Sequence, residues 1–173
     1  MSLQPIRPGS ACLIVGNGPS RSVLRWPFVL QVLRREAPVD LVLINREALG
    51  RTRPDLAVAT KRHLGRKVAQ RWPDVPLVTP ESSPSWWPDL AAGPRAVWAC
   101  SAMGYERIYL YALDGSMEDG ADPKYRRWEA QIEQHVQTRI PIGGMPMLVR
   151  ILPQTVPHAG AKDPLAVERT VRL

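Results

Sequence analysis

The sequence has few of the residues that build metal centres and nucleophilic sites. It contains two cysteines and three histidines in 173 residues, and none of them is spaced as a zinc ligand set. No serine lies in the Gly-x-Ser-x-Gly pattern of a nucleophile elbow. The most closely spaced acids do not follow the pattern of a calcium loop; they are Asp114, Glu118, Asp119 and Asp122. We therefore predict no dedicated metal site and no serine-hydrolase chemistry.

Long apolar runs are also absent. No stretch approaches the roughly 18 apolar residues of a membrane span, and the first residues do not form a basic region followed by an apolar one. The two cysteines, Cys12 and Cys100, lie in apolar surroundings, so we expect buried free thiols in a reducing compartment. These features predict a cytoplasmic protein without a membrane span.

Positive charge is abundant. The formal net charge is +7 and the pI is near 10.0, which indicates an anionic partner such as a nucleotide, a nucleic acid or a phosphorylated sugar. Hydrophobic residues make up 45% of the chain, enough for one well-buried core. We expect a single domain over residues 1–152 and an extended or partly disordered tail over residues 153–173.

Apolar runs without alternation recur along the chain and predict a parallel sheet covered on both faces. They indicate strands at residues 12–15, 41–44, 55–60, 76–78, 107–113 and 147–151, the last at an edge of the sheet. Segments between them predict helices that begin near residues 26, 61, 94 and 123. This alternation favours an α/β fold, a three-layer α/β/α sandwich with a mostly parallel, Rossmann-like sheet.

The stretch ACLIVGNGPS, residues 11–20, ends its apolar run in a turn suited to small residues. Gly16 and Gly18 permit tight or left-handed backbone, and Pro19 followed by Ser20 can begin a helix. Free N–H groups at a helix start attract anions, so the segment predicts a phosphate-sized cradle. An ordinary strand-to-helix turn remains the alternative. The segment matches neither a Walker loop nor the dinucleotide fingerprint, because the Gly-Lys-Ser/Thr ending and the third glycine are missing.

Two stretches together resemble a known group of proteins. CLIVGNGPSRS resembles the amino-terminal motif of the glycosyltransferase family 42 sialyltransferases and of the wider group that includes hydroxymethylpterin diphosphokinase-like proteins. GPRAVWACSAMGYERIYLYALDGS resembles the family segment in which a helix of small residues leads through Gly-Tyr into a strand ending in Gly-x-Asp. Asn45 and Arg46 fall where the family has an Asn after its second strand. The resemblance spans about Cys12 to Ser116.

The resemblance implies a CMP-type nucleotide or nucleotide-sugar ligand and a small transferase. By that resemblance Asn17, Gly18 and Ser20 would hold the donor phosphate or ribose, and Asn45 would contact the nucleotide or sugar. The helix entered through Gly93 would border the cytidine pocket. The chain departs from the family there, with Gly-Pro-Arg where the family has Thr-Ser-Gly.

The sequence supports the candidate catalytic residues less strongly than the candidate binding residues. The family's general-base histidine lies in a later segment with no clear counterpart in this sequence, and His135, within a predicted helix, is the candidate to replace it. Tyr125 is a candidate for a tyrosine that contacts phosphate. Asp114, at the end of a predicted strand, could hold Mg²⁺ beside a diphosphate in a diphosphokinase-like enzyme, although Ala112 replaces the glycine that the family has before it.

A second class of function follows from the basic stretch between Arg51 and Arg71, which holds seven basic residues and one acid. Arg62, Arg66 and Lys67 would form the centre of a surface that binds nucleic acid or another polyanion. A solvated basic helix face is the simpler interpretation, because the stretch adds no aromatic stacking motif. Nucleic acid is therefore an alternative partner and a small nucleotide is the preferred one.

Overall fold

The computed structural model describes residues 11–16, 25–85, 87–113, 127, 130–132, 134, 147–152 and 168–172. Within these residues seven strands form one parallel sheet. The strands are β1 (Ala11–Val15), β2 (Val39–Ile44), β3 (Leu56–Val58), β4 (Leu77–Val78), β5 (Arg107–Tyr111), β6 (Met147–Leu152) and β7 (Glu168–Arg172). The helices are α2 (Trp26–Arg34), η1 (Asn45–Leu49), α3 (Arg62–Arg71) and α4 (Ala92–Ala102).

The strands β1 to β6 form where the sequence predicts them, in segments rich in apolar residues. All five residues of β1 are buried, and β1 lies between β2 and β5 in the middle of the sheet. A strand buried on both faces must be apolar at every position, because side chains alternate between the faces. Leu13 and Val15 pack with the cluster that contains α2 and α3 residues, whereas Cys12 and Ile14 pack with α4.

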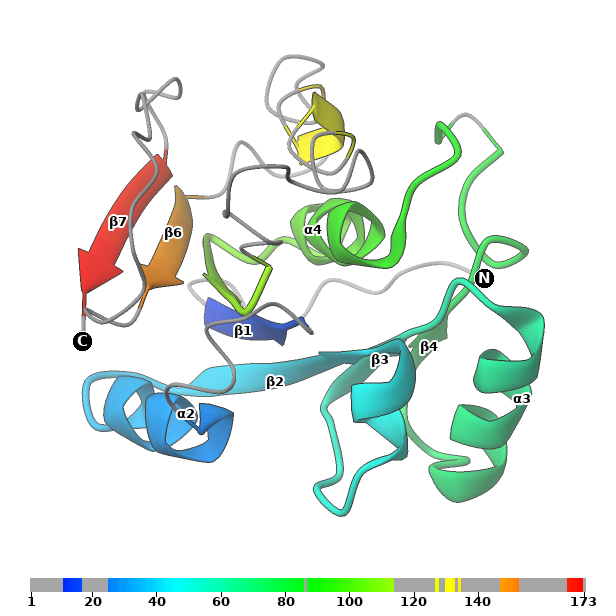
Figure 1. Ribbon diagram of the computed structural model, residues 1–173, viewed down its shortest axis with the longest axis horizontal. Coiled ribbons are helices and arrows are strands. Elements are labelled where there is room, and N and C mark those ends of the chain that lie inside the picture. The colour runs from blue at the N-terminus through cyan, green and yellow to red at the C-terminus, as the bar shows by residue number, and fades with distance from the viewer. Residues whose placement is uncertain are drawn as a thin grey trace, which may run out of the picture.

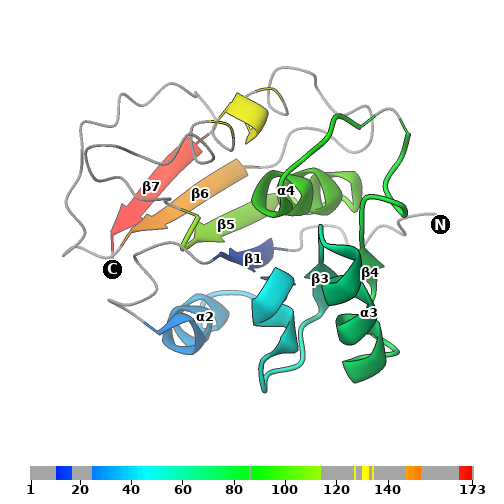
Figure 2. The same ribbon diagram turned by 45° about the vertical axis from the view of Figure 1, so that its right-hand side comes forward.

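The helices cover both faces of the sheet and complete the three layers. Figures 1 and 2 show α2 and α3 on one side of the sheet and α4 on the other. The face under α2 and α3 buries Val29, Leu30 and Val68, and the opposite face buries Val97 and other α4 residues. This arrangement confirms the predicted α/β sandwich with a Rossmann-like sheet.

The strand order is β4-β3-β2-β1-β5-β6-β7. The chain therefore moves outward from β1 in one direction through β4, and then crosses back over the sheet through α4 to start β5 on the other side of β1. The order of the strands reverses between β1 and β5. In open parallel sheets such a reversal leaves a crevice at the carboxyl ends of the two strands, where ligands bind.

The prediction that the strand at residues 147–151 lies at an edge of the sheet is wrong. This strand, β6, pairs with β5 on one side and with β7 on the other. Residues 168–172, in the segment that we expected to be extended or partly disordered, form β7 and pair with Leu148 to Leu152. These five residues contain one apolar residue, Val171, so they form no apolar run. The rest of that segment lies outside the described residues.

The two cysteines have the state predicted for them. Cys12 in β1 and Cys100 in α4 are free thiols, and both are completely buried. Burial raises the pKa of the Cys12 thiol well above its usual value, and the neighbouring Cys100 raises it further. Both side chains therefore act as small apolar residues between the sheet and α4. Among the described residues, none of the helices has the length and the apolar character that crossing a bilayer requires.

Candidate functional site

The candidate site lies at the carboxyl end of the sheet. We define this end by the five residues that directly follow the strands β1 to β5. These are Gly16, Asn45, Ala59, Thr79 and Ala112. Parallel strands bring all of them to the same edge of the sheet. Gly16 and Asn45 are two of the residues that the sequence predicts at the nucleotide site, and the topology places both at this edge.

The closest approach at this edge is between the segments that follow β1 and β5. The Gly16 N–H donates to the Tyr111 carbonyl over 2.8 Å. A Cβ atom on Gly16 would overlap the Ala112 carbonyl oxygen and would lie 2.6 Å from Leu113 Cδ2. Glycine is therefore required here for the close approach of the two backbones. The two strands that border the strand-order reversal are thus held together at their carboxyl ends.

Two residues at this end of the sheet adopt left-handed backbone. Asn45, directly after β2, has φ of 51°, and Ala112, directly after β5, has φ of 53°. An L-residue with a Cβ atom pays about 1–2 kcal/mol for this conformation, although Asn tolerates it better than Ala. Such strain persists only where the surrounding structure imposes it, and it gathers at functional sites. Both strained residues flank β1, the central strand.

Asn45 also joins two strand ends through its side chain. Its Oδ1 accepts the Thr60 N–H over 3.1 Å and the Thr60 hydroxyl over 3.4 Å. Thr60 lies just beyond β3, so this amide ties the loop after β2 to the loop after β3. Arg46, the next residue predicted at the site, is exposed in η1. The structure therefore gives Asn45 a positioning role at the edge.

The start of α4 contributes to the same end of the sheet through a buried arginine. The Arg95 guanidinium donates from Nη1 to Ser83 Oγ over 2.6 Å and from Nη2 to the Leu90 carbonyl over 3.2 Å. Ser83 in turn donates to the carbonyl of Thr79, which directly follows β4. Burial lowers the pKa of Arg95. Gly93, predicted to border the ligand pocket, is buried in the first turn of this helix.

Sequence reasoning named Arg95 only as a departure from the family pattern, and it missed the left-handed backbone at Ala112. One signal for Arg95 is present in the sequence. An arginine stands among small apolar residues in the first turn of a helix, where acids are favoured and cations are not. No such signal exists for Ala112, because the sequence does not reveal φ.

Several predicted site residues lie outside the described part of the chain. These are Asn17, Gly18, Pro19 and Ser20 of the cradle, and the catalytic candidates Asp114, Tyr125 and His135. The acidic run after β5 lies outside it as well. Among the described residues, no group of three or more histidine, cysteine, aspartate or glutamate side chains is gathered as a metal site.

The basic face of α3 is exposed, as the alternative function requires. Arg62, Arg66 and Lys67 all point to solvent, while Leu64 and Val68 of the same helix are buried. The helix contains no acidic residue. Among the described residues, none of these three cations forms an ion pair with a carboxylate. The face is therefore a continuous positive strip along one helix.

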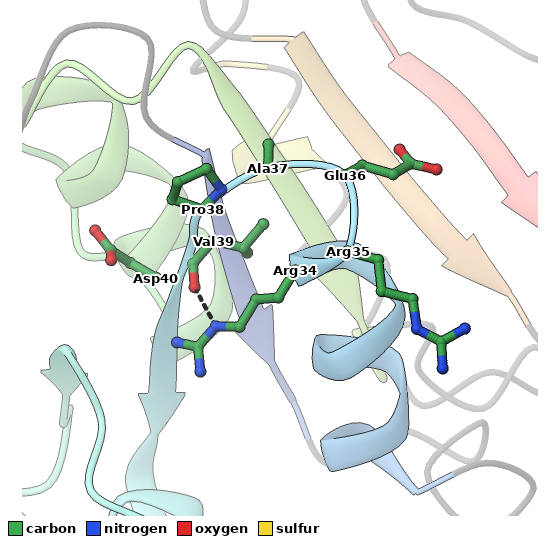
Figure 3. A pocket seen from close by; sticks show the side chains of 7 residues that line it. All are labelled: Arg34, Arg35, Glu36, Ala37, Pro38, Val39 and Asp40. Atoms are coloured by element: carbon green, nitrogen blue, oxygen red, sulfur yellow. Dashed lines mark hydrogen bonds between the residues drawn. The ribbon is translucent and has the colours of Figure 1, made fainter.

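The opposite end of the sheet carries a hollow of about 460 Å³, lined by residues 34–40 between α2 and β2 (Figure 3). It is an open surface depression beside the amino end of β2. The Arg34 Nε–H donates to the Val39 carbonyl over 2.8 Å, and Arg34 also approaches Asp55 to 3.5 Å. Next to it, the Tyr105 hydroxyl donates to Asp40 over 2.7 Å. The bond from Arg34 to Val39 closes the turn between α2 and β2. The hollow lies at the end of the sheet opposite the candidate site.

Comparison with protein-family models, with curated proteins and with solved structures found no match for this chain.

We expect Gly16→Ala to lower the free energy of unfolding by about 3 kcal/mol, because the new Cβ must push apart two backbone segments. This corresponds to a fall in Tm of about 6–12 °C. Gly65→Ala is the matched control, since its Cβ would lie 3.4 Å from Thr79 Cγ2 in ordinary contact, and α3 gains helix propensity. Thermal unfolding followed by circular dichroism measures both. Equal Tm values for the two variants would contradict the close approach.

We expect Asn45→Ala to lower the free energy of unfolding by about 2 kcal/mol, because it removes the bond to Thr60 and leaves a Cβ residue in left-handed backbone. Asn45→Gly loses the same bond but relieves the backbone, so it should retain more stability than Asn45→Ala. Urea unfolding midpoints compare the two variants. If they unfold at the same urea concentration, the left-handed backbone is not what favours asparagine here.

Proposed function

We propose that this protein binds a nucleotide or a nucleotide-sugar at the carboxyl end of its sheet, between β1 and β5. The observation that carries the proposal is the reversal of strand order at this point, with Gly16 holding the two strand ends together. Ligands of open parallel sheets bind in the crevice that such a reversal creates. Gly16, the first residue of the Gly-Asn-Gly-Pro-Ser sequence, lies at this end of the sheet.

The chemistry of the surrounding residues supports a phosphorylated ligand. Small residues after β1 let a ligand approach the backbone, and backbone N–H groups are the donors that phosphates use. The resemblance of this segment to the family 42 sialyltransferases favours a CMP-type ligand and, if the protein is an enzyme, transfer of a sugar from that donor. Transfer would proceed by direct displacement at the sugar carbon, with a base taking the acceptor proton and the protein stabilising the departing phosphate.

Titration calorimetry with CMP, CDP, UDP and their sugars, each with and without Mg²⁺, tests the proposal. We expect a CMP-type ligand to bind. Binding of diphosphates only in the presence of Mg²⁺ would instead favour the diphosphokinase-like alternative. Failure of every nucleotide to bind at millimolar concentration would overturn the proposal.

Substitution of Asn17, in the predicted phosphate-binding segment, tests whether this segment contacts the ligand. We expect Asn17→Ala to weaken CMP binding about tenfold with little change in Tm, because one hydrogen bond to a charged group contributes about that much. Gln70→Ala removes an exposed amide on α3 and serves as the control, with binding unchanged. Loss of folding in Asn17→Ala would assign the segment a structural role.

The exposed face of α3 supports a second candidate function, the binding of nucleic acid or another polyanion. Lysine and arginine side chains without carboxylate partners neutralise phosphates and release counterions, and this binding weakens steeply as salt rises. The three basic residues at the centre of this face are Arg62, Arg66 and Lys67. Their helix, α3, lies on the side of the sheet away from α4 (Figure 2).

Charge reversal separates the two functions. We expect Arg62→Glu combined with Arg66→Glu to abolish binding to a duplex oligonucleotide at low salt, while titration with CMP is unchanged. Arg25→Glu combined with Arg35→Glu removes the same charge from exposed positions next to α2 and is the control. If both double variants weaken oligonucleotide binding equally, the net charge of the protein explains the binding. That result would contradict a dedicated binding surface on α3.

A further inference from the structure

We propose that Arg95 and the first turn of α4 form a binding position for an oxyanion, the phosphate group of the ligand. The identity of the molecule that carries this phosphate rests on the proposed nucleotide function. The position itself rests on the buried charge of Arg95 and on the positive end of α4.

The Arg95 side chain is a cation buried without a neutralising partner. The residue is only 3% exposed. Its two hydrogen bonds go to uncharged oxygens, those of Ser83 and Leu90, and its Nε–H has no acceptor in the described structure. No carboxylate of the described residues forms an ion pair with it. Buried charges are normally paired, because removing an ion from water costs several kcal/mol.

The nearest acids do not compensate this charge. Asp89 and Glu81 act on Arg95 only through their longer-range fields. The Asp89 carboxylate pairs with Arg127 over 3.1 Å, and its side chain is 89% exposed. Glu81 is also exposed. Solvent screens both carboxylates, so neither replaces a direct partner.

The start of α4 adds more positive charge at the same place. The helix has no acid in its first turn, and its cap residue, Ala91, has no side chain able to accept a hydrogen bond. The amides of Ala92 and Gly93 are among those that an α-helix leaves without an intrahelical acceptor. The guanidinium reaches back to the Leu90 carbonyl, directly before the cap, and so lies beside this positive helix end.

A buried guanidinium beside a positive helix end is unfavourable unless an anion is bound there. The two groups together supply what a phosphate uses, namely planar N–H donors and amide donors at a helix start. The Gln131 side chain supports the arrangement, because its Oε1 accepts the Ala91 N–H and its Nε2 donates to the Asp89 carbonyl. These bonds fix the cap backbone and leave the next amides for a ligand.

Thermal unfolding in buffer without multivalent anions, with inorganic phosphate added stepwise, tests the position. We expect phosphate at about ten times its Kd to raise the Tm of the wild type by about 3 °C. Arg95→Met should lose this rise and keep a Tm close to the wild type without phosphate, because it removes an unneutralised buried charge. Arg35→Met, the same change at an exposed site outside both proposed binding surfaces, should keep the full rise.

A second variant makes the test independent of how Arg95→Met folds. Ala91→Asp places a carboxylate at the cap of α4, next to the guanidinium. We expect it to raise the Tm without phosphate by about 3 °C and to abolish the further rise with phosphate, since the built-in anion occupies the position. A lower Tm in Ala91→Asp, or a full phosphate response in either variant, would overturn the inference.

Titration with CMP and cytidine separates this inference from the proposed function. If both are correct, Arg95→Met binds CMP at least about tenfold more weakly and binds cytidine as the wild type does. Equal CMP affinity in the wild type and Arg95→Met would overturn the Arg95 position and leave nucleotide binding intact. A phosphate response that depends on Arg95, in a protein that binds no nucleotide, would overturn the proposed function and leave the position intact.

Discussion

The contact between the segments after β1 and β5 is the constraint on which the rest of the structure depends. The Gly16 N–H donates to the Tyr111 carbonyl, and the Ala112 carbonyl leaves no room for a side chain on Gly16. This contact joins the half of the sheet built before α4 to the half built after it. Because β1 is buried on both faces, its neighbours cannot separate without exposing apolar side chains from both core clusters. The candidate site is therefore placed on the most strongly buried part of the sheet.

Strained backbone lies on both sides of this contact. Asn45 and Ala112 follow the two strands that flank β1, and both turn into left-handed backbone as they leave the sheet. The bond from Asn45 to Thr60 holds one of these two positions in place. The close contact at Gly16 is thus flanked on both sides by backbone that costs energy to maintain.

The sequence carries most of the information on the fold and less on the site. Apolar runs predict the strands from β1 to β6, because strands covered on both faces are apolar at most positions. They fail for β7, whose sequence Glu-Arg-Thr-Val-Arg is mostly polar. The site depends on features with no sequence period. The φ of Ala112 and the partners of Arg95 arise from contacts between segments far apart in the chain. Gly16 and Asn45 carry a clearer local signal, since their residue types suit tight backbone.

Positively charged side chains lie in two environments, the exposed face of α3 and the buried position of Arg95. The environment of a cation determines which anions it can recognise. The cations on α3 are exposed and screened, so they attract any polyanion and discriminate poorly among them. Arg95 is buried, where a charge interacts more strongly and only a ligand of matching shape can reach it. A net charge of +7 favours an anionic partner for the whole protein, but it does not distinguish these cases. A buried cation is therefore better suited than an exposed one to the specific phosphate recognition that we propose, because there the alternative to binding is an unpaired charge rather than a hydrated one.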